Sequence, residues 1–278
     1  YQQCISTRDK KSMSYLLFQA SFTVYCIATV MYIIFFFSQK NQIRRVARII
    51  FIVAGSLHTV NILFRYLEAG HTPITSVHET ISFFAWSIAW CHLSFRWRYT
   101  VKNSGTFAVL IVLLLMLTAS VASREIVPLP PEMRSWWLPL HASVSIIAAA
   151  FLTLAAIGGS MYLVQERELK QKRFGFFFSR FPSLDTLDKL NQHCISIGFP
   201  LMTVGMLFGY LWAHQIWGGR PWQWNPKIVS AIITWLLYAG LMHQRFTLGW
   251  RGRRAAWITV VAFCAVLLTF WFVIKRGA

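Results

Sequence analysis

The sequence predicts an all-α fold: a polytopic membrane helical bundle of about eight transmembrane helices. Apolar residues make up 56% of the 278 residues and charged residues only 13%, whereas a soluble globular chain carries about 25% charged residues. The net charge is +18, and the basic residues stand in short clusters between long apolar runs, as in multi-pass membrane proteins. A nucleic-acid-binding protein would instead carry them on a polar, water-soluble surface, so nucleic acid is not an expected partner.

Eight apolar stretches approach the length of about 20 residues that an α-helix needs to cross a bilayer. The first is too long for the apolar core of a signal peptide, and no small-residue cleavage site follows it, so we expect it to be a membrane helix. The eight predicted spans are about 15–37, 47–66, 79–95, 106–122, 138–164, 194–214, 228–244 and 255–274.

The distribution of Lys and Arg predicts the orientation, because basic residues in short loops mark the cytoplasmic side. With an even number of spans, both termini lie on one side. The loops after the first, third, fifth and seventh spans hold 17 of the 27 basic residues, and the termini with the other loops hold 10. We therefore expect both termini outside and the loop around 167–189 in the cytoplasm, where its basic residues contact anionic membrane lipid.

The loop after the sixth predicted span, residues 215–227, is unusually aromatic. Trp212, Trp217, Trp222 and Trp224 fall within thirteen residues, and the loop also holds two glycines and two prolines. Tryptophan at a membrane interface has a simple explanation, because its ring is apolar and its N–H is hydrated. Four of them on a bent outer loop favour a second interpretation, a platform for a large flat ligand.

His141 lies at the start of the fifth predicted span, on the same outer side, directly after Trp136-Trp137-Leu-Pro-Leu. A histidine near the membrane surface can simply be solvated. Beside a Trp-rich platform it could instead be an axial ligand of a haem. From the residues alone, both interpretations stay open.

Three further histidines fall within apolar spans, where ionisable groups are costly and usually functional. His58 is near the middle of the second span, and His92 and His243 are near the inner ends of the third and seventh. Two facing histidines on different helices would hold a bis-histidine haem b, although each could instead be a neutral histidine bonded to a neighbouring helix. At 1.5 Å per residue, His58 is about 10 Å nearer the membrane centre than His243, so His92 matches His243 better in depth.

The other residue types exclude several kinds of chemistry. The five cysteines form no C-x-x-C pair and no C-x-x-C-H motif, so a zinc site, a thioredoxin-like centre and covalent haem attachment to this chain are not expected. Phosphate-binding and hydrolase motifs are also missing. The remaining histidines lie in or beside loops, where ordinary roles are favoured: His71, His78, His193 and His214.

The segment from Trp217 to Arg245, which reads Trp-Gly-Gly-Arg-Pro-Trp-Gln-Trp-Asn-Pro-Lys and ends in Leu-Met-His-Gln-Arg, resembles the WWD region of the cytochrome c assembly proteins. Within that family it is most similar to the CcsA/ResC branch, with CcmC and HemX-like proteins as relatives. The resemblance extends over nearly the whole chain, because further family-like motifs follow in order: Leu57-His58-Thr59, Gly70 to Trp86, Leu140-His141, Tyr162 to Arg167, Leu184 to Asn191, Gly198-Phe-Pro200 and Trp250 to Ala256.

The resemblance implies one cytochrome c assembly domain over residues 1–278, with 215–227 as its WWD-like outer loop. It implies a protein of a bacterial-type cytoplasmic membrane that takes haem b, held non-covalently, to the outer face and presents it to apocytochrome c. It also implies a ResB-like (CcsB-like) membrane partner and a role in a haem-attachment, or synthase, system. By position, Trp212, Trp217, Trp222 and Trp224 would cradle haem, His141 would be the outer axial ligand, and His243 the ligand within the membrane, with His58 as a further one.

Departures from the family pattern, in the WWD motif and after the last span, favour an alternative function. Asn225 stands where the WWD motif has an acidic residue, and Ile228 where another acid is usual. The family's second outer histidine follows the last span, and this sequence reaches Ala278 without it. We then expect His71, His78, His214 or another subunit to supply that ligand. The alternative is a non-catalytic relative, a membrane subunit or regulator of a larger complex with or without haem b.

Overall fold

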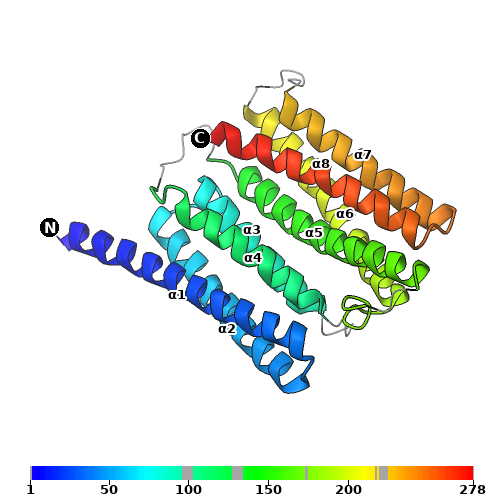
Figure 1. Cartoon of the computed structure of the whole chain (residues 1–278). Coiled ribbons are helices and arrows are strands. Elements are labelled where there is room, and N and C mark those ends of the chain that lie inside the picture. The colour runs from blue at the N-terminus through cyan, green and yellow to red at the C-terminus, as the bar shows by residue number, and fades with distance from the viewer. Residues whose placement is uncertain are drawn as a thin grey trace. The chain divides into compact units, whose positions relative to one another are not determined.

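The structure is a computed structural model that describes residues 2–95, 103–126, 134–172, 175–216, 218 and 225–277, with 2–12 and 273–277 described by their backbone alone. Within these residues all regular structure is helical (Figure 1), which confirms the predicted all-α class. The eight helices are α1 (Gln2–Ser38), α2 (Asn41–Ala69), α3 (Val77–Phe95), α4 (Ser104–Val121), α5 (Trp137–Lys170), α6 (Leu184–Ile216), α7 (Pro226–Thr247) and α8 (Arg253–Gly277).

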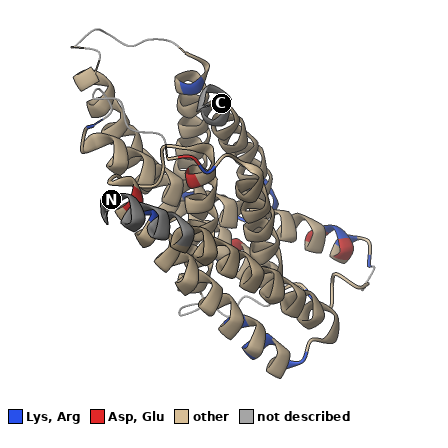
Figure 2. Cartoon of the chain, turned by 90° about the vertical axis from the view of Figure 1, so that its left-hand side faces the viewer, with Lys and Arg blue, Asp and Glu red and all other residues tan. Residues whose placement is uncertain are grey.

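Seven of the helices in the described part of the chain are long and apolar enough to cross a membrane, so the chain is a multi-pass membrane protein. Charged residues gather toward helix ends and leave long uncharged stretches between them (Figure 2). Of the eight predicted spans, α3 is the one that is not among these seven apolar helices. It carries polar residues such as Glu79, Ser82 and His92. These three side chains are buried, because protein rather than lipid covers them, as polar groups at membrane depth require.

The chain divides into two compact units, which we describe separately. The first unit, Tyr1–Ser94 with Gly105–Pro131, contains α1 to α4. Its core is built around Tyr25, Tyr32 and Phe51, which are at most 1% exposed. The rings of Tyr25 and Tyr32 meet the Phe51 ring edge-on, with centroids 5.7 and 6.0 Å away. Aromatic rings therefore fill the space where α1 and α2 pack together.

The second unit, Phe95–Ser104 with Glu132–Ala278, contains α5 to α8. Its centre is α5, which packs against both α6 and α8. Small residues make this possible: a Cβ on Gly159 would lie 3.2 Å from the carbonyl oxygen of Ala256 in α8. Such close backbone approach is the usual way in which membrane helices associate.

Candidate functional site

His141 is the best-defined candidate ligand in the second unit. It lies in the second turn of α5, after Pro139, which the first turn of a helix tolerates. Its Nδ1 is 2.7 Å from the carbonyl oxygen of Gly205 in α6. A carbonyl oxygen only accepts, so Nδ1 carries the hydrogen, and in the neutral ring Nε2 holds the lone pair. Within the described part of the chain, Nε2 has no hydrogen-bond partner, so this ring is oriented as a metal-ligating histidine would be.

Two glycines of α6 allow close contact with α5 beside His141: Gly209 leaves space for the His141 ring and Gly205 for Ser145. A Cβ at Gly209 would lie 2.7 Å from both Cε1 and Nδ1 of His141, and a Cβ at Gly205 would lie 2.5 Å from Oγ of Ser145. Both distances are too short for real contacts, so α5 and α6 could not approach in this way with larger residues. The two glycines are four residues apart, on one face of α6, as in the small-residue motifs that join membrane helices.

Trp212 completes this side of the site. Its ring is nearly parallel to that of His141, with an interplanar angle of 11° and 6.5 Å between centroids. Its buried Nε1 has no hydrogen-bond acceptor among the described residues. A buried donor without an acceptor is costly, so this N–H is available to a ligand. Together, His141 and Trp212 offer a lone pair, a flat apolar surface and a hydrogen-bond donor at one end of α5 and α6.

The predicted Trp-rich loop is only partly covered by the structure. Trp217, Trp222 and Trp224 lie outside the described residues, so their part in the site stays a prediction. At the end of the loop, Asn225 is the N-cap of α7: its Oδ1 accepts from the backbone N–H of Ile228 at 3.0 Å, and Pro226 occupies the first helical position. Asn225 thus has a local structural role that does not need an acidic side chain.

His243 lies near the other end of α7, 17 residues after Pro226, or about 26 Å along the helix axis at 1.5 Å per residue. The buried residues of α7, which include Tyr238, Leu241 and Arg245, follow helical spacing on the opposite face. The His243 side chain is exposed on this chain. It therefore points away from the interior of its unit, and the second unit does not bring it to His141.

His58 belongs to the first unit and is fully buried. Its Nε2 is 2.9 Å from Oγ of Ser82 and its Nδ1 is 3.4 Å from the hydroxyl of Tyr25. Both ring nitrogens of His58 are hydrogen-bonded, whereas His141 is bonded, among the described residues, through Nδ1 alone. Ligation by His58 would therefore require the ring to give up its bond to Ser82 or its bond to Tyr25.

The loop histidines differ in their surroundings. His214 is exposed near the end of α6, with its ring centroid 6.2 Å from that of Tyr210. Nδ1 of His71 lies 3.2 Å from the carbonyl oxygen of Thr72. His78 is buried and lines a polar pocket of the first unit. Among the described residues no three His, Cys, Asp or Glu side chains come together as a metal site.

The sequence prediction did not include Gly205 and Gly209, although the four-residue spacing of two glycines within an apolar span is a readable signal. It also did not include the polar lining of the pocket at His78, because those residues come from three helices and a loop that only the fold brings together.

Comparison with known proteins adds independent information. The sequence model of a protein family described as "Cytochrome C assembly protein" matches residues 74–275. A cytochrome c biogenesis protein CcsA of Synechococcus sp. (strain RCC307) is 30% identical over 246 residues, which cover 80% of this chain and 79% of the relative. The protein of the same name from Prochlorococcus marinus (strain MIT 9301) is 32% identical over 254 residues (83% and 82%), and that from Guillardia theta is 28% identical over 225 residues (74% of each).

Proposed function

Because this chain belongs to the cytochrome c assembly protein family, we propose that it acts in cytochrome c maturation by binding haem b non-covalently and presenting it to apocytochrome c. The observation that carries the proposal is the 2.7 Å hydrogen bond from Nδ1 of His141 to the carbonyl oxygen of Gly205. It leaves Nε2 as the ligating atom and holds the ring against rotation. The nearly parallel indole ring of Trp212 beside this imidazole adds a flat apolar surface to the same position.

In this proposal each residue of the site has its own role. His141 binds the haem iron through Nε2. Trp212 packs against a porphyrin edge, and the Trp212 Nε1–H donates to an acceptor on the haem. We propose Trp217, Trp222 and Trp224 as further porphyrin contacts. In the reaction, each of two apocytochrome cysteine thiols adds across a haem vinyl group, with sulfur bonding to one carbon and hydrogen to the other. The chain contributes position and exclusion of water, since a fixed geometry removes much of the entropic barrier.

His243 is proposed as a ligand for haem in transit. Its exposed position on α7 favours a site completed by a partner, and a ResB-like (CcsB-like) membrane subunit is the proposed one. We also propose a bacterial-type cytoplasmic membrane with both termini and the Trp-rich loop outside, supported by the 17 to 10 division of the basic residues. The role of His58 as a haem ligand stays a prediction. The free nitrogen that supports the proposal for His141 is missing in His58, because both of its ring nitrogens are hydrogen-bonded.

The test is a haem measurement on the purified protein in detergent, by the absorption of its pyridine complex. We expect the wild type to contain haem, His141→Gly to lose most of it, and added imidazole to restore it by replacing the missing ligand. His193→Gln, a histidine outside the site, is the matched control and should retain haem. A wild type without haem, or full retention in His141→Gly, would overturn the proposal.

A further inference from the structure

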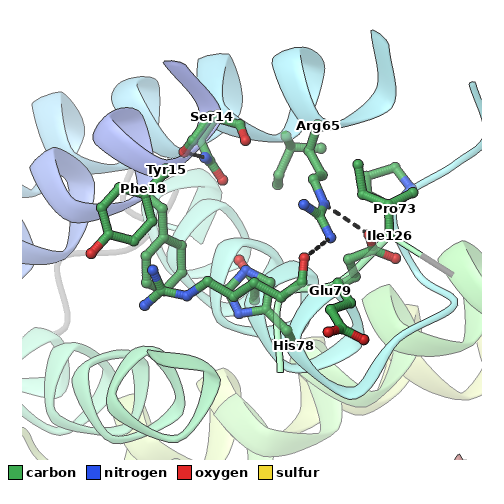
Figure 3. Close-up of a pocket in the computed structure, with 13 residues that line it drawn as sticks. Ser14, Tyr15, Phe18, Arg65, Pro73, His78, Glu79 and Ile126 are labelled. Atoms are coloured by element: carbon green, nitrogen blue, oxygen red, sulfur yellow. Dashed lines mark hydrogen bonds and ion pairs between the residues drawn. The ribbon is translucent and has the colours of Figure 1, made fainter. Parts of the chain in front are cut away.

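The first unit contains a polar pocket that the haem proposal does not use. Its volume is about 350 Å³, within the range of about 300–1,000 Å³ typical of small-molecule sites. Figure 3 shows Ser14 and Phe18 of α1, Arg65 of α2, and His78 and Glu79 of α3 around it. Glu79 and His78 are only 3% and 7% exposed. Burying such groups in a membrane protein is costly, and it usually marks a binding site.

The pocket lies at the ends of the membrane-crossing helices α1, α2 and α4 and at the start of α3. The apolar span of α1 begins at Met13, α2 ends at Ala69, α3 begins at Val77 and α4 ends at Val121. The lining residues Ser14, Arg65, His78 and Arg124 all fall within about one turn of these ends. Helix ends of this kind lie at the depth of the lipid headgroups.

One of the two arginines is neutralised within the protein. Nε of Arg65 donates to Oε1 of Glu79 at 2.9 Å, and Nη2 donates to the carbonyl oxygen of Arg124 at 2.8 Å. The other oxygen of Glu79 accepts from the backbone N–H groups of Thr75 and Ser76, at 3.2 and 3.3 Å. Glu79 is therefore fully occupied as an anchor for Arg65 and for the start of α3.

Arg124 has no such counter-charge among the described residues. Its guanidinium lies over the rings of Tyr15 and Phe18, with Cζ at 4.8 and 5.0 Å from their centroids, and Nη2 donates to the carbonyl oxygen of Ser120 at 3.2 Å. The nearby Glu125 also lines the pocket, but no described carboxylate comes within 4 Å of this guanidinium. A positioned guanidinium with free donors is suited to a phosphate oxygen.

The same pocket also offers hydrogen-bond acceptors. Nδ1 of His78 donates to the carbonyl oxygen of Ala119 at 2.7 Å, so Nε2 of the neutral ring accepts. Nδ2 of Asn61 donates to the carbonyl oxygen of Ser14 at 2.7 Å, which leaves the Asn61 amide oxygen as an acceptor. A matching ligand therefore carries an anionic group together with hydroxyl or ammonium donors.

We propose that this pocket binds the headgroup of a glycerophospholipid, with its phosphodiester on Arg124 and its headgroup hydroxyl or ammonium group on His78 and Asn61. Phosphatidylglycerol and phosphatidylethanolamine have both features, whereas phosphatidylcholine has the phosphodiester without a donor. The acyl chains leave the pocket past Tyr15, which is 45% exposed, and enter the bilayer. The lipid would join α1 and α2 to α3 and the segment after α4.

The experiment measures lipid retention by the purified full chain with native mass spectrometry after delipidation and addition of one lipid at a time. We expect the wild type to retain phosphatidylglycerol or phosphatidylethanolamine at least about tenfold better than phosphatidylcholine. Phosphatidylcholine cannot donate hydrogen bonds to His78 and Asn61, and the loss of such bonds lowers affinity by about this factor. Arg124→Gln should weaken retention about tenfold. Arg45→Gln, which removes an exposed arginine of α2 outside the pocket, is the matched control and should not.

The other outcomes decide against the proposal. Equal retention of all three lipids would overturn a lipid headgroup site. So would equal lipid retention by Arg124→Gln and the control, or retention of free glycerol phosphate equal to that of the lipids. Loss of haem in Arg124→Gln with unchanged lipid retention would assign the pocket to haem instead. Because Arg124→Gln could fold poorly, His78→Phe provides a second variant. It keeps an aromatic ring beside Phe18 but removes the Nε2 acceptor together with the hydrogen bond from Nδ1 to the Ala119 carbonyl oxygen, and its lipid retention should also fall.

Discussion

The imidazole of His141 and the indole of Trp212 lie almost parallel, at 11°, with 6.5 Å between their ring centroids. The two residues come from different helices, so this relationship depends on how α5 and α6 pack. Gly205 and Gly209 precede Trp212 on α6: the carbonyl oxygen of Gly205 accepts the His141 hydrogen bond, and Gly209 leaves space for the His141 ring. The orientation of His141, the proposed haem ligand, therefore depends on the packing of α5 against α6.

Gly209→Ala should displace the His141 ring, because the new Cβ would lie 2.7 Å from two ring atoms. We expect the hydrogen bond to Gly205 to break and haem content to fall several-fold. The matched control is Gly240→Ala in α7, where a Cβ meets nothing within 4 Å. There the change should raise the free energy of unfolding by about 0.5–1 kcal/mol and leave haem unchanged. The haem content per protein and thermal unfolding in detergent measure these effects on haem binding and stability. A normal haem content in Gly209→Ala would contradict the role of Gly209 in positioning His141.

His58→Leu should affect stability rather than haem. The change leaves Ser82 and the Tyr25 hydroxyl without their partner in a fully buried position, and an unsatisfied buried polar group costs about 1–3 kcal/mol. The expected result is a lower unfolding temperature with unchanged haem per folded protein. If haem is lost while the fold persists, His58 is a ligand, as its place in the second span predicts.

The sequence predicted the helices well, because long apolar runs bounded by basic clusters are a direct consequence of the bilayer. It predicted α3 as an ordinary span, and its polar residues at Glu79 and Ser82 only make sense once the fold buries them. It proposed His141 as a candidate ligand, since a histidine beside tryptophans at a span end is visible in the chain, and this stays a prediction. It could not identify which histidines have a free nitrogen, because that depends on partners such as Gly205 and Ser82 that lie 64 and 24 residues away.

Asn225→Asp should be tolerated where Asn225→Ala is not. The side-chain oxygen caps α7 by accepting from the Ile228 N–H, and loss of such a cap costs about 1 kcal/mol. Aspartate keeps the acceptor, and its charge interacts favourably with the helix N-terminus, by about 0.3–1 kcal/mol. Thermal unfolding of the three proteins in one detergent distinguishes them. A loss of stability in Asn225→Asp equal to that in Asn225→Ala would show that the cap is not what Asn225 contributes.

The buried ion pair between Arg245 and Asp188 gives the strongest stability prediction. Nη2 of Arg245 lies 2.8 Å from Oδ1 of Asp188 and 2.9 Å from Oδ1 of Asn191, and the same Asp188 oxygen accepts from the backbone N–H of Gly252 at 3.0 Å. The pair thus joins α6, α7 and the turn before α8. The Arg245 side chain is only 3% exposed, so Asp188→Asn would leave a buried guanidinium without its counter-charge. We expect a loss of about 3–5 kcal/mol.

The double variant Asp188→Leu/Arg245→Met should be less destabilised than Asp188→Asn alone, because it removes both buried charges. The matched control is one turn away: Asp185 and Lys189 form a 2.7 Å pair on the same helix as Asp188, but their side chains are 72% and 61% exposed. Asp185→Asn should therefore cost no more than about 0.5 kcal/mol. Denaturation in detergent across the four proteins measures the differences. Equal effects of Asp188→Asn and Asp185→Asn would mean that burial of the Arg245 guanidinium does not determine the contribution of the pair.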